Sequence, residues 1–416
     1  MRTQRWLGAL AERDFRLYFV GQSTSAVGTG MLPVALSFAV LDRSGSAGQV
    51  GLVLGAETLP LVLLLLVAGV VADRTNRRAV MVGADLLRAS SQSALALWLL
   101  LGRPPLWGFL VAEALVGTGT AFFTPAMTGL IPHVARPEHL QQANALNSLS
   151  RWSGALVGPA LAGLLVAGPG AGWAVAVDAA SYLVSAMCLL RLGGDWTRGA
   201  AGETFLAQLR DGWHAFRQRT WLWVVVTQFS FYGLPAFYVF GAVVAKRSLG
   251  GAIAWGAVLA AQGAGSVVAA VVMLRVQPRR PLLVGELVMF AWAALLAALA
   301  VRAPVAVVAV CAFAAGAAFG VFGPLWDTTM QRELPDEVLS RASAYDWFGS
   351  FALLPVGYGV VGFMARGLGI DGALWLGAIY LALTTAGVLL LPSVTGLQAR
   401  LQPPDTVTVR PASSSG

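Results

Sequence analysis

Four ionisable residues interrupt long apolar stretches of this chain of 416 residues: Glu57, Asp85, Arg88 and Glu113. A charge in the hydrocarbon of a membrane costs at least about 2.5 to 3.5 kcal/mol. An ionisable residue is therefore retained there only where it pairs with another group or serves a function. Asp85 and Arg88 stand three residues apart, which puts them on one side of a helix and predicts an internal pair. Glu57 and Glu113 are the candidates for binding and releasing a proton.

Glu57 lies near the middle of its apolar stretch, where the loss of water favours the neutral acid. Two interpretations stay open: Glu57 carries a coupling proton, or it pairs permanently with a residue such as Arg88 or across the helix bundle. Four other acidic residues stand within one or two turns of the end of an apolar stretch, where water or a gate would satisfy them: Asp178, Glu286, Asp327 and Asp346.

The composition excludes an ordinary soluble domain. Hydrophobic residues make up 57% of the chain, charged residues 12%, and the mean hydropathy is +0.71, whereas soluble domains carry about 25% charged residues. The net charge of +8 sits in small basic groups between apolar stretches, with no continuous basic face for nucleic acid. The two cysteines fall inside apolar stretches without metal-ligand spacing. These features indicate a polytopic membrane protein.

The apolar stretches predict twelve membrane spans of about 20 residues each. They fall at about 15–40, 49–72, 79–101, 105–126, 144–167, 172–190, 221–243, 252–274, 281–301, 304–326, 342–364 and 373–391. Loops on one side hold most of the basic residues, which places both termini in the cytoplasm and the chain in the plasma membrane. The expected fold is an all-α membrane protein.

The longest internal loop, residues 191–220, divides the spans into two groups of six. Phe205, Leu209, Trp213 and Phe216 recur there at helical spacing, which predicts an amphipathic helix on the cytoplasmic membrane surface. We therefore expect two pseudo-related six-helix bundles, residues 1–190 and 221–391, joined by this linker. Residues 392–416 are rich in Pro, Ser and Thr and predict a disordered cytoplasmic tail.

Two motifs combine glycine with residues that shape helix contacts. The loop after the second span reads Gly69-Val-Val-Ala-Asp73-Arg74-Thr-Asn-Arg77-Arg78. Its glycine permits close helix approach, its Asp suits the positive end of a neighbouring helix, and its arginines hold the loop in the cytoplasm. We expect it to act as a gate. In the fifth span, Gly154, Gly158, Pro159 and Gly163 favour close packing and a bend.

The loop motif resembles the signature loop of the major facilitator superfamily of secondary transporters, and the glycine and proline motif resembles that of its exporters. The stretches Pro125-Ala126, 140–146, 178–185 and 339–346 are similar to the drug-exporter branch that includes macrolide and siderophore efflux proteins. The resemblance implies proton-driven export of a small amphiphilic compound by alternating access, with antibiotic resistance as a consequence. Many proton-drug antiporters have an Arg four residues before a G-x-G; here Glu113 precedes Gly117-Thr-Gly119.

Aromatic residues gather in the seventh and eleventh spans, and the first span carries a polar run. Such residues suit a central cavity for a bulky, partly apolar ligand. The cavity candidates are Gln22, Phe229, Tyr232, Tyr238, Trp347 and Phe351.

Two other classes of function compete with export. The same fold would also serve an importer or a facilitator of a small metabolite or lysolipid, because helical periodicity does not encode direction. The sequence argues against a membrane enzyme, since the three histidines fall in predicted loops and no H-E-x-x-H, G-x-S-x-G or P-loop motif occurs. We expect no cofactor, no metal and no nucleic acid. The expected partners are a small-molecule substrate, membrane lipid and protons, and the expected state is a monomer.

Overall fold

The computed structural model describes residues 8–136, 139–193, 213, 217–230, 234–273, 276, 278–334, 345–346 and 348–398. Every regular element in these ranges is helical, and none is a strand. The described part of the chain is therefore all-α, as its composition predicted. The predicted linker helix falls almost wholly outside the described residues.

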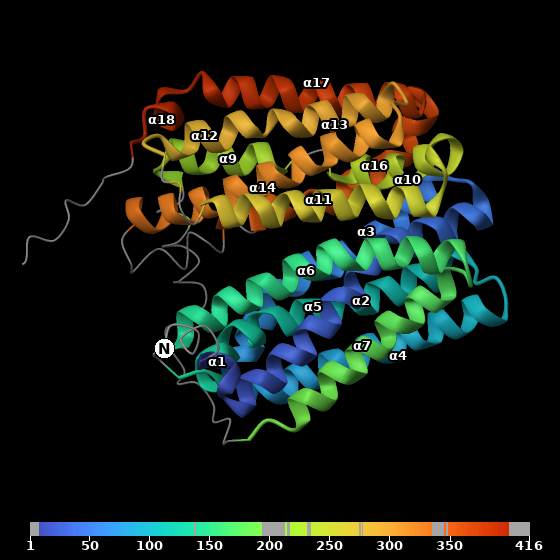
Figure 1. Ribbon diagram of the computed structural model, residues 1–416, viewed down its shortest axis with the longest axis vertical. Coiled ribbons are helices and arrows are strands. Elements are labelled where there is room, and N and C mark those ends of the chain that lie inside the picture. The colour runs from blue at the N-terminus through green and yellow to red at the C-terminus, as the bar shows by residue number, and fades with distance from the viewer. Residues whose placement is uncertain are drawn as a thin grey trace, which may run out of the picture.

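The first half of the chain forms seven described helices, which Figure 1 shows side by side below the others. They are α1 (Gly8–Ala11), α2 (Arg13–Ser44), α3 (Ala47–Arg74), α4 (Arg77–Leu101), α5 (Leu106–Val134), α6 (Leu140–Ala167) and α7 (Ala171–Leu190). The turns between them are short, so consecutive long helices run in opposite directions. Gly45, with φ of 63°, closes α2, and the Ser46 side chain caps α3.

The second half lies above the first in the same view and contains more broken helices. Its described elements are α9 (Thr220–Ser230), α10 (Leu234–Val244), η3 (Ala245–Leu249), α11 (Ala252–Met273), α12 (Pro281–Val288), α13 (Phe290–Ala300), α14 (Val305–Glu333), α16 (Leu354–Gly367), α17 (Gly369–Leu389) and α18 (Pro392–Thr395). Val394 of α18 is buried. The segment that we predicted to begin the disordered tail is thus a packed helical turn.

Ten helical segments of the described chain are long and apolar enough to cross a membrane. The chain is a multi-span membrane protein. Of the twelve spans that the sequence predicts, two are not among these ten. The helix α4 carries Asp85 and Arg88 within its length, and α9 and α10 are separated by residues 231–233, which lie outside the described residues.

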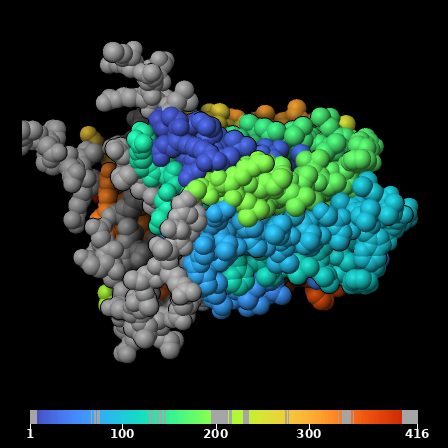
Figure 2. Space-filling view, turned by 90° about the horizontal axis from the view of Figure 1, so that it is seen from below, coloured from blue at the N-terminus to red at the C-terminus, as the bar shows by residue number. Residues whose placement is uncertain are grey.

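The helix α7 is wedged between α2 and α4. Figure 2 shows this arrangement on one face of the molecule, with α7 in light green, α2 in dark blue and α4 in lighter blue. The inner side of α7 buries Asp178, Ser181, Tyr182 and Ser185, at intervals of three and four residues. This spacing puts a polar stripe on one face of an otherwise apolar helix, and that stripe faces its neighbours in the first half.

Glycines bring α6 into backbone contact with two helices. A Cβ on Gly158 would lie 2.7 Å from Gly30 Cα of α2, and a Cβ on Gly163 would lie 2.9 Å from the Ala252 carbonyl oxygen of α11. Only a residue without a side chain fits at these distances. The glycine and proline motif thus serves contacts within the first half through Gly158, and contacts between the halves through Gly163.

We predict that Gly158→Ala lowers the thermal stability of the purified protein, by about 1 to 3 kcal/mol, because the added methyl group forces α2 and α6 apart. The matched control is Gly83→Ala in α4, where a Cβ meets no heavy atom within 4 Å and alanine stabilises the helix. Thermal unfolding in detergent measures both. Equal melting temperatures for the two variants would show that the α2–α6 contact is not close packed.

Candidate functional site

The guanidinium of Arg88 lies at the centre of a buried cluster in the first half. Arg88 is 6% exposed, and its Nη2 donates to Asp85 Oδ1 one turn earlier on α4. The guanidinium carbon lies 4.4 Å from the ring centroid of Phe123 and 4.3 Å from that of Tyr182. Two aromatic faces and one carboxylate therefore hold this cation in place away from water.

Three further carboxyl groups surround the Asp85–Arg88 ion pair. Glu57 of α3 and Asp178 of α7 are attracted electrostatically to Arg88. Glu113 of α5 is repelled by both Glu57 and Asp178. Three helices thus bring Asp85, Glu57 and Asp178 toward one guanidinium, and α5 adds Glu113 next to two of these acids. A single cation cannot neutralise them all, so the cluster must hold protons whenever it is closed to water.

Two glycines of α5 make room for this cluster. A Cβ on Gly117 would overlap the backbone carbonyl oxygen of Glu57, and a Cβ on Gly119 would lie 2.6 Å from Arg88 Cγ. Gly117 therefore allows the backbone of α3 to approach α5 at Glu57, and Gly119 allows the aliphatic part of the Arg88 side chain to pack against α5. The arginine next to this G-x-G motif thus comes from α4 and not from α5 itself.

Glu113 is held by an amide. Gln92 Nε2 donates to Glu113 Oε1 at 3.0 Å, and both side chains are fully buried. The other two atoms, Gln92 Oε1 and Glu113 Oε2, have no partner among the described residues. A carboxylic acid and an amide form two parallel hydrogen bonds when the acid keeps its proton. The arrangement therefore suits a neutral Glu113.

A similar pair lies in the second half. Gln228 Nε2 donates to Glu286 Oε2 at 3.2 Å and to Thr385 Oγ1 at 3.1 Å. Gln228 Oε1 and Glu286 Oε1 have no partner among the described residues. We had expected Glu286 to be satisfied by water or a gate near a span end, whereas it is fully buried. The helix α12 packs against α14 and α17, which excludes water from the carboxyl group.

The prediction for Asp178 is wrong in the same way as that for Glu286. We expected water or a gate to satisfy it near a span end, but it is fully buried. Neither of its carboxyl oxygens accepts a hydrogen bond of good geometry within the described part of the chain. The wedged position of α7 between α2 and α4 removes it from water. The polar stripe on α7 was the signal in the sequence that could have revealed this position.

The polar run of α2 lines the same region. Gln22 Nε2 donates to Ser185 Oγ at 3.3 Å, and the Thr29 hydroxyl lies 3.0 Å from the Tyr182 hydroxyl. Thr29 is exposed although it lies in the middle of α2. The cluster therefore borders an accessible surface at Thr29.

Other cavity candidates are distributed more widely. Tyr238 is half-buried in α10 and stacks edge-on against Phe237, with ring centroids 5.1 Å apart, while Phe351 is 37% exposed. Nothing is described for the side chains of Phe229, Tyr232 and Trp347.

The two halves meet where Tyr358 of α16 packs on α3. A Cβ on Gly55 would lie 2.9 Å from Tyr358 Cβ. Tyr358 interacts electrostatically with Glu57 and with Tyr238. Glu57 is thus the acid of the cluster that adjoins the second half. A second contact between the halves lies near the C-terminal end of α2, where Asp42 forms an ion pair with Lys246 of η3.

The first turn of α4 anchors α7. The stretch that the sequence predicts to be a loop lies mostly in helices, since α3 continues to Arg74 and α4 begins at Arg77. Arg78 Nε donates to the carbonyl oxygen of Leu189 at 2.8 Å, and Arg78 Nη2 donates to that of Leu190. These carbonyls end α7, where cations are favoured. The Asn76 side chain caps α4, and Arg77 is the first residue of that helix. Nothing is described for the surroundings of Gly69 or for the side chains of Asp73 and Arg74.

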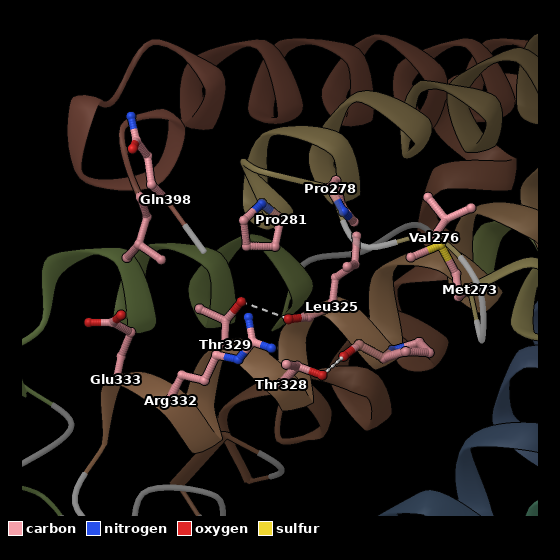
Figure 3. A pocket seen from close by; sticks show the side chains of 12 residues that line it. Met273, Val276, Pro278, Pro281, Leu325, Thr328, Thr329, Arg332, Glu333 and Gln398 are labelled. Carbon is pink, nitrogen blue, oxygen red and sulfur yellow. Dashed lines mark hydrogen bonds between the residues drawn. The ribbon is translucent and has the colours of Figure 1, made fainter. Parts of the chain in front are cut away.

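A separate cavity of about 130 Å³ lies at the far end of α14. Figure 3 shows its walls, which come from α11, α12, α14 and the segment after α18. Thr328 and Thr329 donate to carbonyl groups one turn earlier on their own helix. Its lining includes no residue of the Arg88 cluster, so it forms no part of the candidate site.

Comparison with known families decides the identity of this fold. The family model described as transmembrane secretion effector matches residues 5–408. The chain belongs to this family of the major facilitator superfamily. Solved structures agree on the fold: the nucleoside transporter NupG covers 91% of this chain and 99% of its own, with a TM-score of 0.72 and 12% identity. A bacterial homologue of the lysosomal transporter Spinster, inward-facing and unoccupied, covers 91% and 96%, with a TM-score of 0.68 and 15% identity.

Three of the curated relatives are efflux proteins. Macrolide efflux protein A of Streptococcus pyogenes is 24% identical over 216 residues, which are 51% of this chain and 53% of that protein. Multidrug efflux pump Tap of Mycolicibacterium fortuitum is 34% identical over 199 residues, 45% of this chain and 48% of the pump. Enterobactin exporter EntS of Shigella boydii is 31% identical over 200 residues, 46% and 47% of the two chains. The chain therefore spans about half the length of the curated relatives it matches.

We predict that Glu113→Gln leaves the amount of folded protein in the membrane unchanged, because glutamine reproduces the neutral acid beside Gln92. Glu113→Ala should lower thermal stability by about 1 to 3 kcal/mol, since it leaves the buried Gln92 amide without a partner. Fluorescence-detected chromatography and thermal unfolding measure the two effects. A clear loss of folded protein in Glu113→Gln would show that Glu113 is ionised in the native state.

Proposed function

We propose that this protein exports a small amphiphilic compound, of drug, antibiotic or siderophore type, by alternating access driven by protons. The observation that carries the proposal is the cluster of buried carboxyl groups around Arg88, which holds more acid than its one cation can neutralise. A facilitator that only let its substrate diffuse across the membrane would not need buried ionisable groups, whose burial costs free energy. The efflux activities of the relatives support the direction of transport.

The proposed architecture has twelve spans in two six-helix bundles. Here α4 is the third span, and α9 and α10 together form the seventh. The bundles contact each other through α6 with α11 and through α3 with α16. We propose that both termini are cytoplasmic, that the protein acts as a monomer in the plasma membrane, and that the Asp42–Lys246 pair therefore lies at the outer surface. In this orientation the structure represents a state closed to the outside.

Glu57 is the acid best placed to couple protons to this movement. It is only partly buried, whereas Glu113 is enclosed with Gln92. Its neighbour Tyr358 belongs to the opposite half. Separation of α3 from α16 would therefore change the surroundings of Glu57 and, with them, its hold on a proton. The loop motif of Gly69, Asp73, Arg74, Arg77 and Arg78 acts as the gate on the cytoplasmic side.

Growth inhibition tests the export proposal. A host that lacks its own efflux pumps should tolerate a higher concentration of at least one macrolide when it expresses this protein, and a siderophore-producing host that lacks its exporter should recover secretion. The control is the same host with an empty vector. An unchanged profile across macrolides, other amphiphilic antibiotics and catecholate siderophores would contradict drug and siderophore export. A higher sensitivity would indicate import.

We predict that Glu57→Gln still exchanges substrate across a vesicle membrane but fails to concentrate it against a gradient, because glutamine mimics the protonated acid and cannot release a proton. Counterflow and gradient-driven uptake into proteoliposomes measure the two activities. Glu113→Gln is the matched control and should keep both. Full gradient-driven transport by Glu57→Gln, with an unchanged dependence on pH, would remove Glu57 from the coupling mechanism.

A further inference from the structure

Asp178 lies against a bare stretch of backbone on α2. A Cβ on Gly28 would lie 2.8 Å from Asp178 Oδ1, so only the missing side chain of glycine leaves space for the carboxyl group. The helix α7 itself packs between α2 and α4 (Figure 2), and Asp178 is fully buried. The carboxyl group is thus held between two helices at a distance from water.

Charged and titratable groups near Asp178 come from three other helices as well as from its own. The helix α4 contributes Arg88, which forms an ion pair with Asp85, while α3 contributes Glu57 and α5 contributes Glu113. Tyr182 faces it from its own helix. From α2 comes only an uncharged group, the Thr29 hydroxyl, which lies nearby but contacts the Tyr182 hydroxyl at 3.0 Å. Arg88 is the one cation among these groups.

The hydrogen-bonding groups of Arg88 and Asp178 are complementary but unused. Arg88 Nε has no acceptor among the described residues, and both carboxyl oxygens of Asp178 lack a donor there. The guanidinium stacks on the ring of Tyr182, one turn after Asp178 on the same face of α7. An ionised Asp178 beside a spare N–H donor would bind it strongly. The donor stays free in this state, as expected for a carboxyl group that keeps its proton.

We propose that Asp178 is a second proton-binding residue of the transport cycle and that Arg88 bridges Asp85 and Asp178 once that proton has left. The inference rests on the proposed proton-driven export. When the site opens, the Asp178 carboxyl group gives its proton to water that enters past Thr29. The resulting carboxylate accepts a hydrogen bond from Arg88 Nε, while Arg88 Nη2 keeps its bond to Asp85. The guanidinium remains protonated throughout, so one proton leaves the protein in each such step.

Infrared spectroscopy of the protein in lipid vesicles tests this titration without any transported compound. The wild type should show carbonyl bands of its protonated carboxylic acids, and the band that belongs to Asp178 should disappear when the pH is raised. Asp178→Asn should lack this band. Ser181→Ala, which removes a buried hydroxyl one turn away that donates to the Asp178 backbone, should keep it. A spectrum of Asp178→Asn identical to that of the wild type overturns the proposal.

A second variant covers the case in which Asp178→Asn does not fold. Thr29→Val changes an exposed position and removes only the hydroxyl next to the carboxyl group. It should change the pH at which the carbonyl band disappears, since it replaces a polar group beside Asp178 and the Tyr182 hydroxyl with an apolar one. A band that titrates as in the wild type would place the proton on another acid and would equally overturn the proposal.

Transport of a radiolabelled macrolide into proteoliposomes separates this inference from the proposed function. Asp178→Asn should retain counterflow, but its gradient-driven accumulation should fall by about tenfold for each unit of pH gradient if one proton is lost from the cycle. Ser181→Ala should match the wild type. If wild-type accumulation of macrolides and of siderophores is independent of the pH gradient, the proposed coupling fails. If the wild type is coupled and Asp178→Asn equals it, only the inference about Asp178 fails.

Discussion

The interaction on which the candidate site depends is the enclosure of one guanidinium among four carboxyl groups, at a depth where water is scarce. A buried ion is tolerated only when partners replace its hydration. Arg88 has Asp85 and two aromatic faces for this purpose. The remaining acids cannot all share the same cation, so their protonation has to follow the exposure of the cluster. In the proposed function, this constraint links a movement of helices to the uptake or loss of protons.

Backbone contacts make such a cluster possible. Gly117 and Gly119 let α3 and the stem of Arg88 approach α5, and Gly28 leaves space for Asp178 beside α2. Any side chain at these positions would push the helices apart and admit water or leave a void. These three glycines therefore do more than allow close packing of helices, because they also set the distances between ionisable groups.

The two Gln–Glu pairs show how an acid can be buried at low cost. In each pair the amide donates to one carboxyl oxygen, Gln92 to Glu113 and Gln228 to Glu286, and a proton on the other oxygen could be donated to the amide oxygen. Glu57 and Asp178 have no such amide within the described residues. That difference in partner, rather than depth in the membrane, separates a carboxyl group suited to keep its proton from one suited to exchange it.

The sequence by itself determined the class of the molecule and much of its chain path. Long apolar stretches can satisfy their backbone in a membrane only as helices, so the all-α fold and most span positions follow from composition and length. The spacing of Asp85 and Arg88 likewise placed both on one side of one helix, because that relation is local. What only the tertiary structure decided is which helices share the cluster. Asp178 became part of it because α7 is wedged between α2 and α4, and Glu113 gained Gln92 from a neighbouring helix. Contacts between residues far apart in the chain depend on how helix faces pack, and periodicity within one helix carries no information about its neighbour.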